Sequence, residues 1–115
     1  MMTNVYEPTD GAGQADECFL GLDVSAAEPV LTDLNGRLRV LAEDMGFAYV
    51  DLRGHFNGHG FNHDDPSIPN YDADDPTLWF QGDCIHPTRR GHHELRRLVL
   101  SAADNEPMTL EILDD

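Results

Sequence analysis

The chain has 115 residues, of which 22 are acidic and 7 are basic, and its formal net charge is −15. A chain of this length forms one domain. Its charge excludes nucleic acid and an anionic membrane surface as expected partners, because both attract a basic face. No apolar run approaches the roughly 18 residues of a membrane span. Residues 1–6 lack the basic start and apolar centre of a signal peptide. We therefore expect a cytoplasmic protein, unless a missing N-terminus holds a leader.

Cysteine usage agrees with this compartment. The chain has two cysteines, Cys18 and Cys84, whereas a secreted disulfide framework of this length usually carries four or more. One disulfide is possible, but two free thiols in a reducing cytosol are the better interpretation. Cys84 is then a small buried apolar residue, with a reactive thiol beside His86 as the alternative.

The first predicted element is a short strand over residues 3–7, which are β-branched and aromatic and end at Pro8. A glycine-rich acidic loop follows over residues 10–17. Its glycines lack the GxGxxG spacing between a strand and a helix. A dinucleotide-binding fingerprint is therefore not supported, and we expect no cofactor.

A helix over residues 29–46 is the clearest element. Pro29 suits its first turn, and Gly46 supplies its C-terminal stop. The apolar residues recur at spacings of three and four and predict one buried stripe, formed by Leu31, Leu34, Leu38, Leu41 and Met45.

The residues after this helix predict an α/β fold. Residues 47–52 are nearly continuously apolar, as in a parallel strand that is buried on both faces, and a helix joined tightly to such a strand is half of a βαβ unit. Residues 53–82 form a long irregular stretch, a length that indicates function or disorder. A second amphipathic helix is predicted over about 88–103. Residues 105–115 form an acidic tail, with a possible edge strand over 108–112.

An acid and a histidine lie three residues apart before the second helix. On a tight turn, this spacing brings the Asp83 carboxylate to one nitrogen of His86 and leaves the other nitrogen facing outward. A base and its orienting carboxylate are the two groups that activate a hydroxyl nucleophile. The plainer interpretation is that Asp83 caps the helix and His86 is a surface residue.

The run Asp83-Cys84-Ile85-His86-Pro87, with Gly91 in the following helix, resembles the last motif of the SGNH (GDSL-type) serine hydrolases. That motif is Asp-x-x-His, followed by Pro and a helix that contains Gly. The elements predicted over 3–7, 29–46 and 47–52 look like those that precede it. The resemblance implies part of a three-layer α/β/α (flavodoxin-like) fold with parallel strands and flanking helices. Residues 1–104 would be the C-terminal part of such a domain.

The same resemblance implies an esterase or lipase that transfers an acyl group from a small-molecule ester to water. His86 would be the base and Asp83 the carboxylate that holds its tautomer. The family's Gly-Asp-Ser block and its Gly and Asn oxyanion blocks are absent, and the serines are Ser25, Ser67 and Ser101. We therefore expect the isolated chain to be inactive. A binding module that keeps the fold without the chemistry is the alternative.

A metal site is a further alternative. His55, His59 and His63 are spaced by four, so on a helix their imidazoles would stack on one face and could bind zinc. Gly58 and Gly60 interrupt that helix, so we favour a loop in which His55 and His59 line a pocket. The acids of the same stretch lack the alternation and glycine of a calcium loop and are more typical of a solvated surface: Asp64, Asp65, Asp72, Asp74 and Asp75.

Two aromatic residues, Trp79 and Phe80, precede the acid and histidine pair. They could wall an acyl pocket, but a role in the core is at least as well supported. The two predicted strands are about half of a doubly wound sheet. The strand over 3–7 would then expose an unpaired edge, and such edges recruit other chains. We therefore expect a partly molten chain or self-association through that edge.

Overall fold

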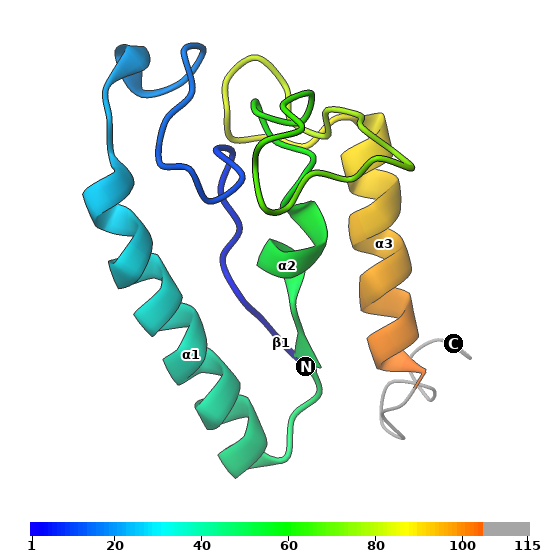
Figure 1. Ribbon diagram of the computed structural model, residues 1–115. Helices are drawn as coiled ribbons and strands as arrows, with labels where there is room; N and C mark the ends of the chain where they lie inside the picture. The colour runs from blue at the N-terminus through cyan, green and yellow to red at the C-terminus, as the bar shows by residue number, and fades with distance from the viewer. Residues whose placement is uncertain (105–115) are drawn as a thin grey trace.

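The structure is a computed structural model that describes residues 1–104. Two long helices flank a central layer of two short strands and a third helix (Figure 1). The elements in chain order are β1 (Met2–Thr3), the 3-10 turns η1 (Phe19–Gly21) and η2 (Ser25–Ala27), α1 (Glu28–Met45), β2 (Tyr49–Val50), α2 (Leu52–Phe56) and α3 (Arg89–Ala103). The tail over 105–115, with its possible edge strand, lies outside the described residues.

The sheet is parallel, and the chain is a mixed α/β protein. Met2 pairs with Tyr49, and Thr3 pairs with Val50. Both strands are shorter than the predicted 3–7 and 47–52. The prediction of a strand buried on both faces is wrong, because within β2 Val50 is buried but Tyr49 is only half-buried. The strand ends because the Asp51 carboxylate accepts the Gly54 N–H at 2.9 Å and caps α2.

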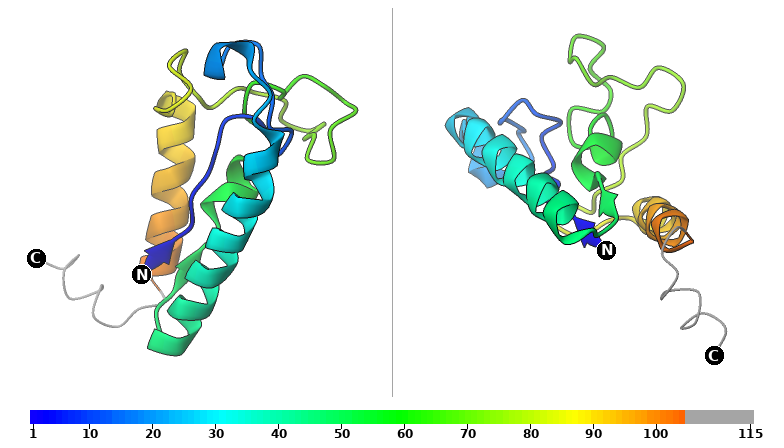
Figure 2. Two further views of the ribbon diagram at one scale, coloured as in Figure 1. Left: turned by 90° about the vertical axis from the view of Figure 1, so that its left-hand side faces the viewer. Right: turned by 90° about the horizontal axis from the view of Figure 1, so that it is seen from below.

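Helix α1 begins and ends close to the predicted residues. Pro29 lies in its first turn, and Gly46 caps it in the left-handed conformation at φ 69°. The two views of Figure 2 place α1 and α3 on opposite sides of the strands. No helix within residues 1–104 is long and apolar enough to cross a membrane.

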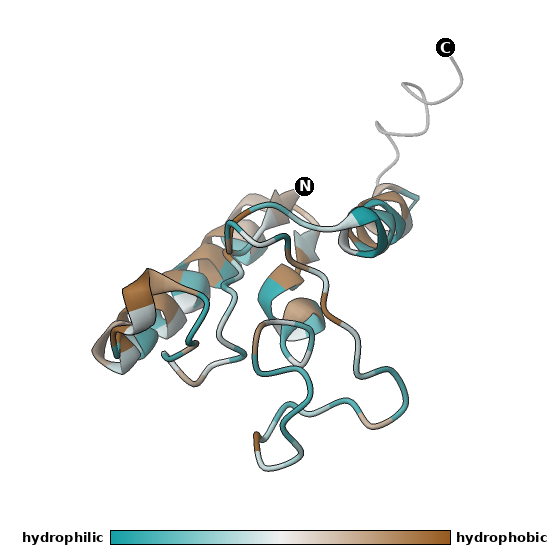
Figure 3. Cartoon of the chain, turned by 90° about the horizontal axis from the view of Figure 1, so that it is seen from above, coloured by the Kyte–Doolittle hydropathy of each residue, from teal (hydrophilic) through white to brown (hydrophobic). Residues whose placement is uncertain are grey.

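The prediction that the apolar stripe of α1 is buried is wrong for three of its members. Leu34, Leu41 and Met45 are 44%, 45% and 55% exposed, and hydrophobic positions colour much of this helix in Figure 3. Two strands of two residues each are too small a surface to cover a helix of 18 residues. The residues that α1 buries are instead Asn35 and Ala42.

The Asn35 side chain takes the place of a neighbouring strand beside Val5, two residues after β1. Its Oδ1 accepts the Val5 N–H at 3.0 Å, and its Nδ2 donates to the Val5 carbonyl at 2.9 Å. The preceding N–H, of Asn4, donates to Val50, and backbone groups alternate sides along an extended chain. The backbone groups of Val5 face away from β2, and Asn35 satisfies their hydrogen bonding. The sequence predicts an open edge at this position.

The hydrophobic core joins α2 to the segment before the acid and histidine pair. Phe56, Trp79 and Phe80 are almost fully buried, and Tyr6 stacks on Phe56 with ring centroids 4.6 Å apart. Phe56 meets Trp79 edge to face at 5.3 Å, a favoured arrangement of aromatic rings. The core thus fixes the backbone immediately before Asp83.

Helix α3 confirms the second predicted helix. Thr88 caps it by accepting the Gly91 N–H at 3.2 Å. A Cβ at Gly91 would lie 2.5 Å from the Trp79 carbonyl oxygen, so only glycine allows α3 to approach the core this closely. Leu95 packs on the core from this helix.

We predict that Asn35→Ala lowers the free energy of unfolding by about 2 kcal/mol, because it removes two hydrogen bonds to the Val5 backbone at about 1 kcal/mol each. Urea denaturation measures this change. Glu43→Ala, at an exposed position of the same helix, should stay within about 0.5 kcal/mol of the parent. Equal effects of the two substitutions would show that the Asn35 bonds do not stabilise the fold.

Candidate functional site

The acid and histidine pair lies in a short loop whose two ends are joined by backbone pairing. An antiparallel bridge joins Phe80 to Pro87, and the Thr88 N–H donates to the Trp79 carbonyl at 2.7 Å. Inside this pairing, the Gln81 N–H donates to the His86 carbonyl at 2.7 Å. The loop is therefore fixed at both ends by the core and by the start of α3.

Every oxygen of the Asp83 carboxylate is engaged within this loop. Oδ1 accepts the backbone N–H groups of Ile85 and His86, each at 3.0 Å, and Oδ2 lies 2.5 Å from His86 Nδ1. The side-chain hydrogen bond with His86 and then the backbone N–H groups lower the pKa of Asp83 from 3.8 to about 2. The carboxylate is thus ionised at neutral pH and aimed at the imidazole.

His86 presents its second nitrogen to the surface. Its side chain is 68% exposed, and within residues 1–104 Nε2 has no hydrogen-bond partner. With Nδ1 held by Asp83, Nε2 is the acceptor of the neutral ring. The i, i+3 spacing of the sequence therefore yields an oriented imidazole, the geometry that a general base needs.

A disulfide joins Cys18 to Cys84, at the tip of this loop, with the two Cα atoms 5.9 Å apart. The prediction of two free thiols is wrong, and so is the alternative of a reactive Cys84, since no free cysteine exists. Packing of two loops brings together residues that are 66 positions apart in sequence. Cys84 has φ 63°, a left-handed conformation that non-glycine residues rarely adopt. The bond ties the segment before η1 to the loop of Asp83 and His86.

No serine within residues 1–104 forms a hydrogen bond with His86. Ser67 donates its hydroxyl to Asp65 at 2.6 Å, and Ser25 lies in η2. Ser101 is 12 residues beyond the first residue of α3, or about 18 Å along the helix axis.

An apolar cavity of about 480 Å³ adjoins the loop. Its wall includes Tyr6, Phe19, Phe80 and Ile85. Trp79 instead lines a different, polar cavity of about 480 Å³. Phe80 and Trp79 are both part of the core, and each lines a different cavity.

The polar cavity contains His55 and His59, and residues 57–63 are not helical. His55 Nε2 lies 3.1 Å from Glu94 Oε2. His63 points elsewhere, with Nδ1 2.8 Å from the Gly60 carbonyl oxygen. The three histidines therefore do not form the stacked face of a zinc site. Within residues 1–104, the side chains that could hold a metal together are His59, Asp72 and Asp75.

Glu94 is a buried acid that the sequence does not single out. It lies on α3 with 10% of its side chain exposed, and Arg97 and Arg90 contact it at 2.8 and 3.4 Å. Burial acts to raise the pKa of Glu94, but the hydrogen bonds from His55 and Arg97 outweigh burial and lower it. The sequence carries a signal for these ion pairs, because Arg90 and Arg97 lie four residues before and three residues after Glu94 on one helix.

A scan against protein-family models found no match, and comparisons with curated proteins and with solved structures found none either. The resemblance to the SGNH hydrolases therefore rests on the run from Asp83 to Pro87. The local geometry of that run agrees with a base and its orienting carboxylate. Its role in catalysis stays a prediction.

We predict that the Asp83 carboxyl titrates near pH 2 and that His86→Ala raises this pKa toward 3.8, because the side-chain hydrogen bond with His86 is the largest cause of its depression. Carbon-13 NMR titration measures it. The depressed pKa means that the pairing stabilises the fold fully above pH 3.8 and that this contribution is lost as the pH falls through about 2. His92→Ala, at an exposed position of α3, should leave the midpoint unchanged. An unchanged midpoint in His86→Ala would contradict the pairing.

We also predict that reducing the disulfide between Cys18 and Cys84 lowers the free energy of unfolding by about 4 kcal/mol, the chain-entropy value for a loop of this sequence separation. Urea denaturation with and without a phosphine reductant measures the difference. A Cys18→Ser, Cys84→Ser double variant should match the reduced protein and ignore the reductant. Two free thiols, counted in the unreduced and denatured chain, would contradict the bond.

Proposed function

We propose that this chain carries the base of an SGNH-type ester hydrolase, as the C-terminal part of a three-layer, flavodoxin-like α/β/α domain. The observation that supports this most directly is the 2.5 Å contact between His86 Nδ1 and Asp83 Oδ2, with Nε2 facing outward. The Asp-x-x-His-Pro run on which the resemblance rests is the one that forms this geometry. The proposed reaction is acyl transfer from an ester to water.

In this proposal a serine from a complementary segment approaches Nε2 of His86. The imidazole takes the hydroxyl proton as the oxygen attacks the ester carbonyl, and it then returns the proton to the leaving alcohol. Asp83 stays ionised, holds the Nδ1–H tautomer and stabilises the imidazolium. The oxyanion donors also come from the complementary segment. The apolar cavity beside Phe80 and Ile85 is the nearest space for an acyl group.

The uncovered surfaces of the chain support a missing partner layer. Leu34, Leu41 and Met45 of α1 are exposed, and so are Val30 and Val40, at 70% and 53%. A sheet of two strands leaves this face without a cover, whereas a doubly wound domain would cover it. Self-association through the same face and the β1 edge is the competing outcome for the isolated chain, and its charge of −15 opposes it.

The disulfide bears on where such a hydrolase would act. Disulfides persist in oxidising compartments and are rare in the cytosol. The bond between Cys18 and Cys84 therefore favours an oxidising compartment over the cytoplasm that we expected from the sequence. A non-catalytic binding module with the same fold remains the alternative function, and it requires no partner segment.

The first test compares the chain alone with a completed domain. The isolated 115-residue chain should show no burst of product with p-nitrophenyl acetate and no labelling by a fluorophosphonate, because within residues 1–104 no serine is hydrogen-bonded to His86. The chain fused behind the N-terminal half of an SGNH hydrolase, which supplies the Gly-Asp-Ser block, should label and turn over the ester. His86→Ala and Asp83→Asn should each lower kcat on the order of 10²–10⁴-fold.

His92→Ala is the matched control, because His92 is also an exposed histidine near the start of α3. It should keep the activity of the fusion. Activity that is equal in His86→Ala and His92→Ala would overturn the proposed base. Labelling of Ser25 or Ser67 in the isolated chain, lost on His86→Ala, would instead mean that the chain holds its own nucleophile.

A further inference from the structure

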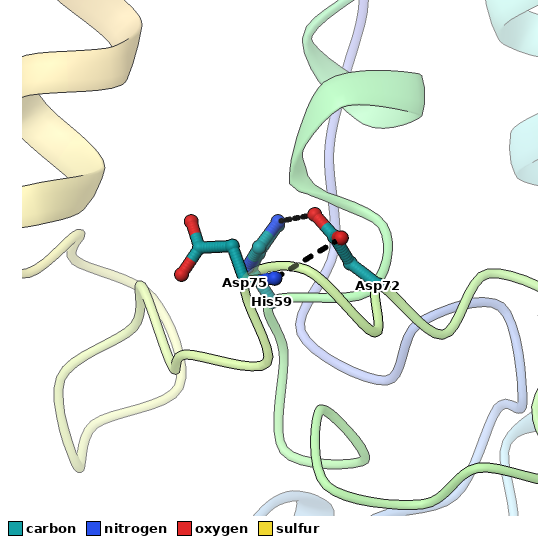
Figure 4. A group of neighbouring side chains, drawn as sticks. All are labelled: His59, Asp72 and Asp75. Atoms are coloured by element: carbon teal, nitrogen blue, oxygen red, sulfur yellow. Dashed lines mark hydrogen bonds and ion pairs between the residues drawn. The ribbon is translucent and has the colours of Figure 1, made fainter.

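A second group of chemical side chains lies in the polar cavity, apart from Asp83 and His86. His59, Asp72 and Asp75 each offer one ligand atom, and these atoms lie within 4.8 Å of one another. Figure 4 shows the His59 imidazole with Asp72 on one side and Asp75 on the other. This set combines one member of the predicted histidine cluster with two members of the predicted acidic surface.

His59 is held in a single orientation. Its side chain is 4% exposed, and its ring lies flat on Trp79, with centroids 3.6 Å apart and planes 1° apart. Nδ1 lies 2.8 Å from the Thr77 carbonyl oxygen, which only accepts hydrogen bonds, so Nδ1 carries a proton. Nε2 faces Asp72 Oδ2 at 3.4 Å.

This arrangement favours positive charge at His59, on its ring or between the ring and the carboxylates. In the neutral ring, Nε2 presents a lone pair toward an ionised carboxylate, and two electron pairs repel each other at this distance. Either a second proton on His59 or a metal ion removes the repulsion. An Nδ1–H donated to a backbone carbonyl is also the usual support of a metal-bound histidine, because it fixes the tautomer and the ring.

We propose that His59, Asp72 and Asp75 bind a divalent transition-metal ion of the zinc type. One imidazole nitrogen and two carboxylate oxygens are ligands that zinc accepts at about 2.0–2.2 Å, with water in an open fourth position. Ligand atoms in such a tetrahedron lie about 3.5 Å apart, so both aspartates turn inward, and Asp75 exchanges hydrogen bonds with Thr77 and Arg90 for the ion. Calcium and magnesium prefer oxygen ligands alone, and the imidazole makes them poorer occupants.

Arg90 allows Asp75 to make this turn. Its Nη2 lies 2.9 Å from Asp75 Oδ2 and 3.4 Å from Glu94 Oε1. When Asp75 moves to the ion, the guanidinium keeps Glu94 as its partner, so no buried charge is left alone. The ion also offsets the excess of acid in the cavity, where three carboxylates face the two guanidinium groups of Arg90 and Arg97.

The role of the ion follows from the positions of its ligands. His59 follows α2, while Asp72 and Asp75 lie 13 and 16 residues further along the irregular segment. An ion that joins them closes the loop over residues 60–71 and holds it against the core. The site is therefore structural, and it is independent of the proposed hydrolase because it shares no residue with the Asp83 and His86 pair.

The test is a zinc titration of the full 115-residue chain at neutral pH, followed by calorimetry and by tryptophan fluorescence. Trp79 is the only tryptophan of the chain and stacks on the His59 ring, so its emission should respond to an ion bound by His59. We expect one zinc ion per chain and a saturable change in Trp79 emission at the same stoichiometry. Asp72→Asn should weaken binding at least tenfold.

Asp74→Asn is the matched control, because Asp74 is exposed, lies two positions after Asp72 and loses the same charge. This variant should bind zinc within twofold of the parent. Near-UV circular dichroism of each variant checks that its fold is kept. Equal affinities of Asp72→Asn and Asp74→Asn, or zinc binding without a Trp79 response, would overturn the site. Asp83→Asn should bind zinc like the parent, so failure of the hydrolase proposal leaves this result unaffected.

Discussion

A buried carboxylate organises the irregular part of this protein. Asp10 is 2% exposed and accepts the backbone N–H groups of Gly58, Gly60 and Asn62 at 2.9, 2.7 and 2.9 Å. Burial raises the pKa of Asp10, and the three N–H groups act against that rise. A Cβ at Gly60 would lie 2.3 Å from the Pro8 carbonyl oxygen, so this close approach requires glycine. Asp10 thereby sets the backbone on both sides of His59, and the stacking of His59 on Trp79 follows from that placement.

Polar side chains do elsewhere what strands do in a larger sheet. Asn4 donates to Asp51 at 2.6 Å and accepts the Arg53 N–H at 2.9 Å, which joins the end of β1 to the start of α2. Asn35 satisfies Val5 in the same manner. Because buried backbone groups must be paired and each strand supplies two residues, asparagine and aspartate complete the hydrogen bonding. A fold built this way depends on individual side chains more than on a regular ladder.

Local patterns in the sequence predicted the local features of the structure. Pro29 and Gly46 mark the start and the end of α1, because both depend on residues close in sequence. Asp83 reaches His86 because a turn of three residues holds the two side chains close together. The burial of the α1 stripe was mispredicted, since periodicity gives the apolar face of a helix but not the size of the surface opposite. The bond of Cys18 with Cys84 and the proximity of His59 to Asp72 and Asp75 arise between loops. In loops, no periodicity exists to indicate which residues meet.

The disulfide gives the chain a covalent topology that the ribbon does not show. Cys18 and Cys84 close a ring that contains α1, β2 and α2, while β1 and α3 are attached to it as branches. Tension applied between the two ends of the chain would follow the shorter covalent path across the sulfur atoms, so the 65 residues inside the ring cannot be drawn out while the bond is intact. At about 3.5 Å per extended residue, the ring shortens the fully stretched length of the chain by roughly 230 Å. The core residues Phe56 and Trp79 both lie within the ring, so stretching can separate them only by deforming a closed loop.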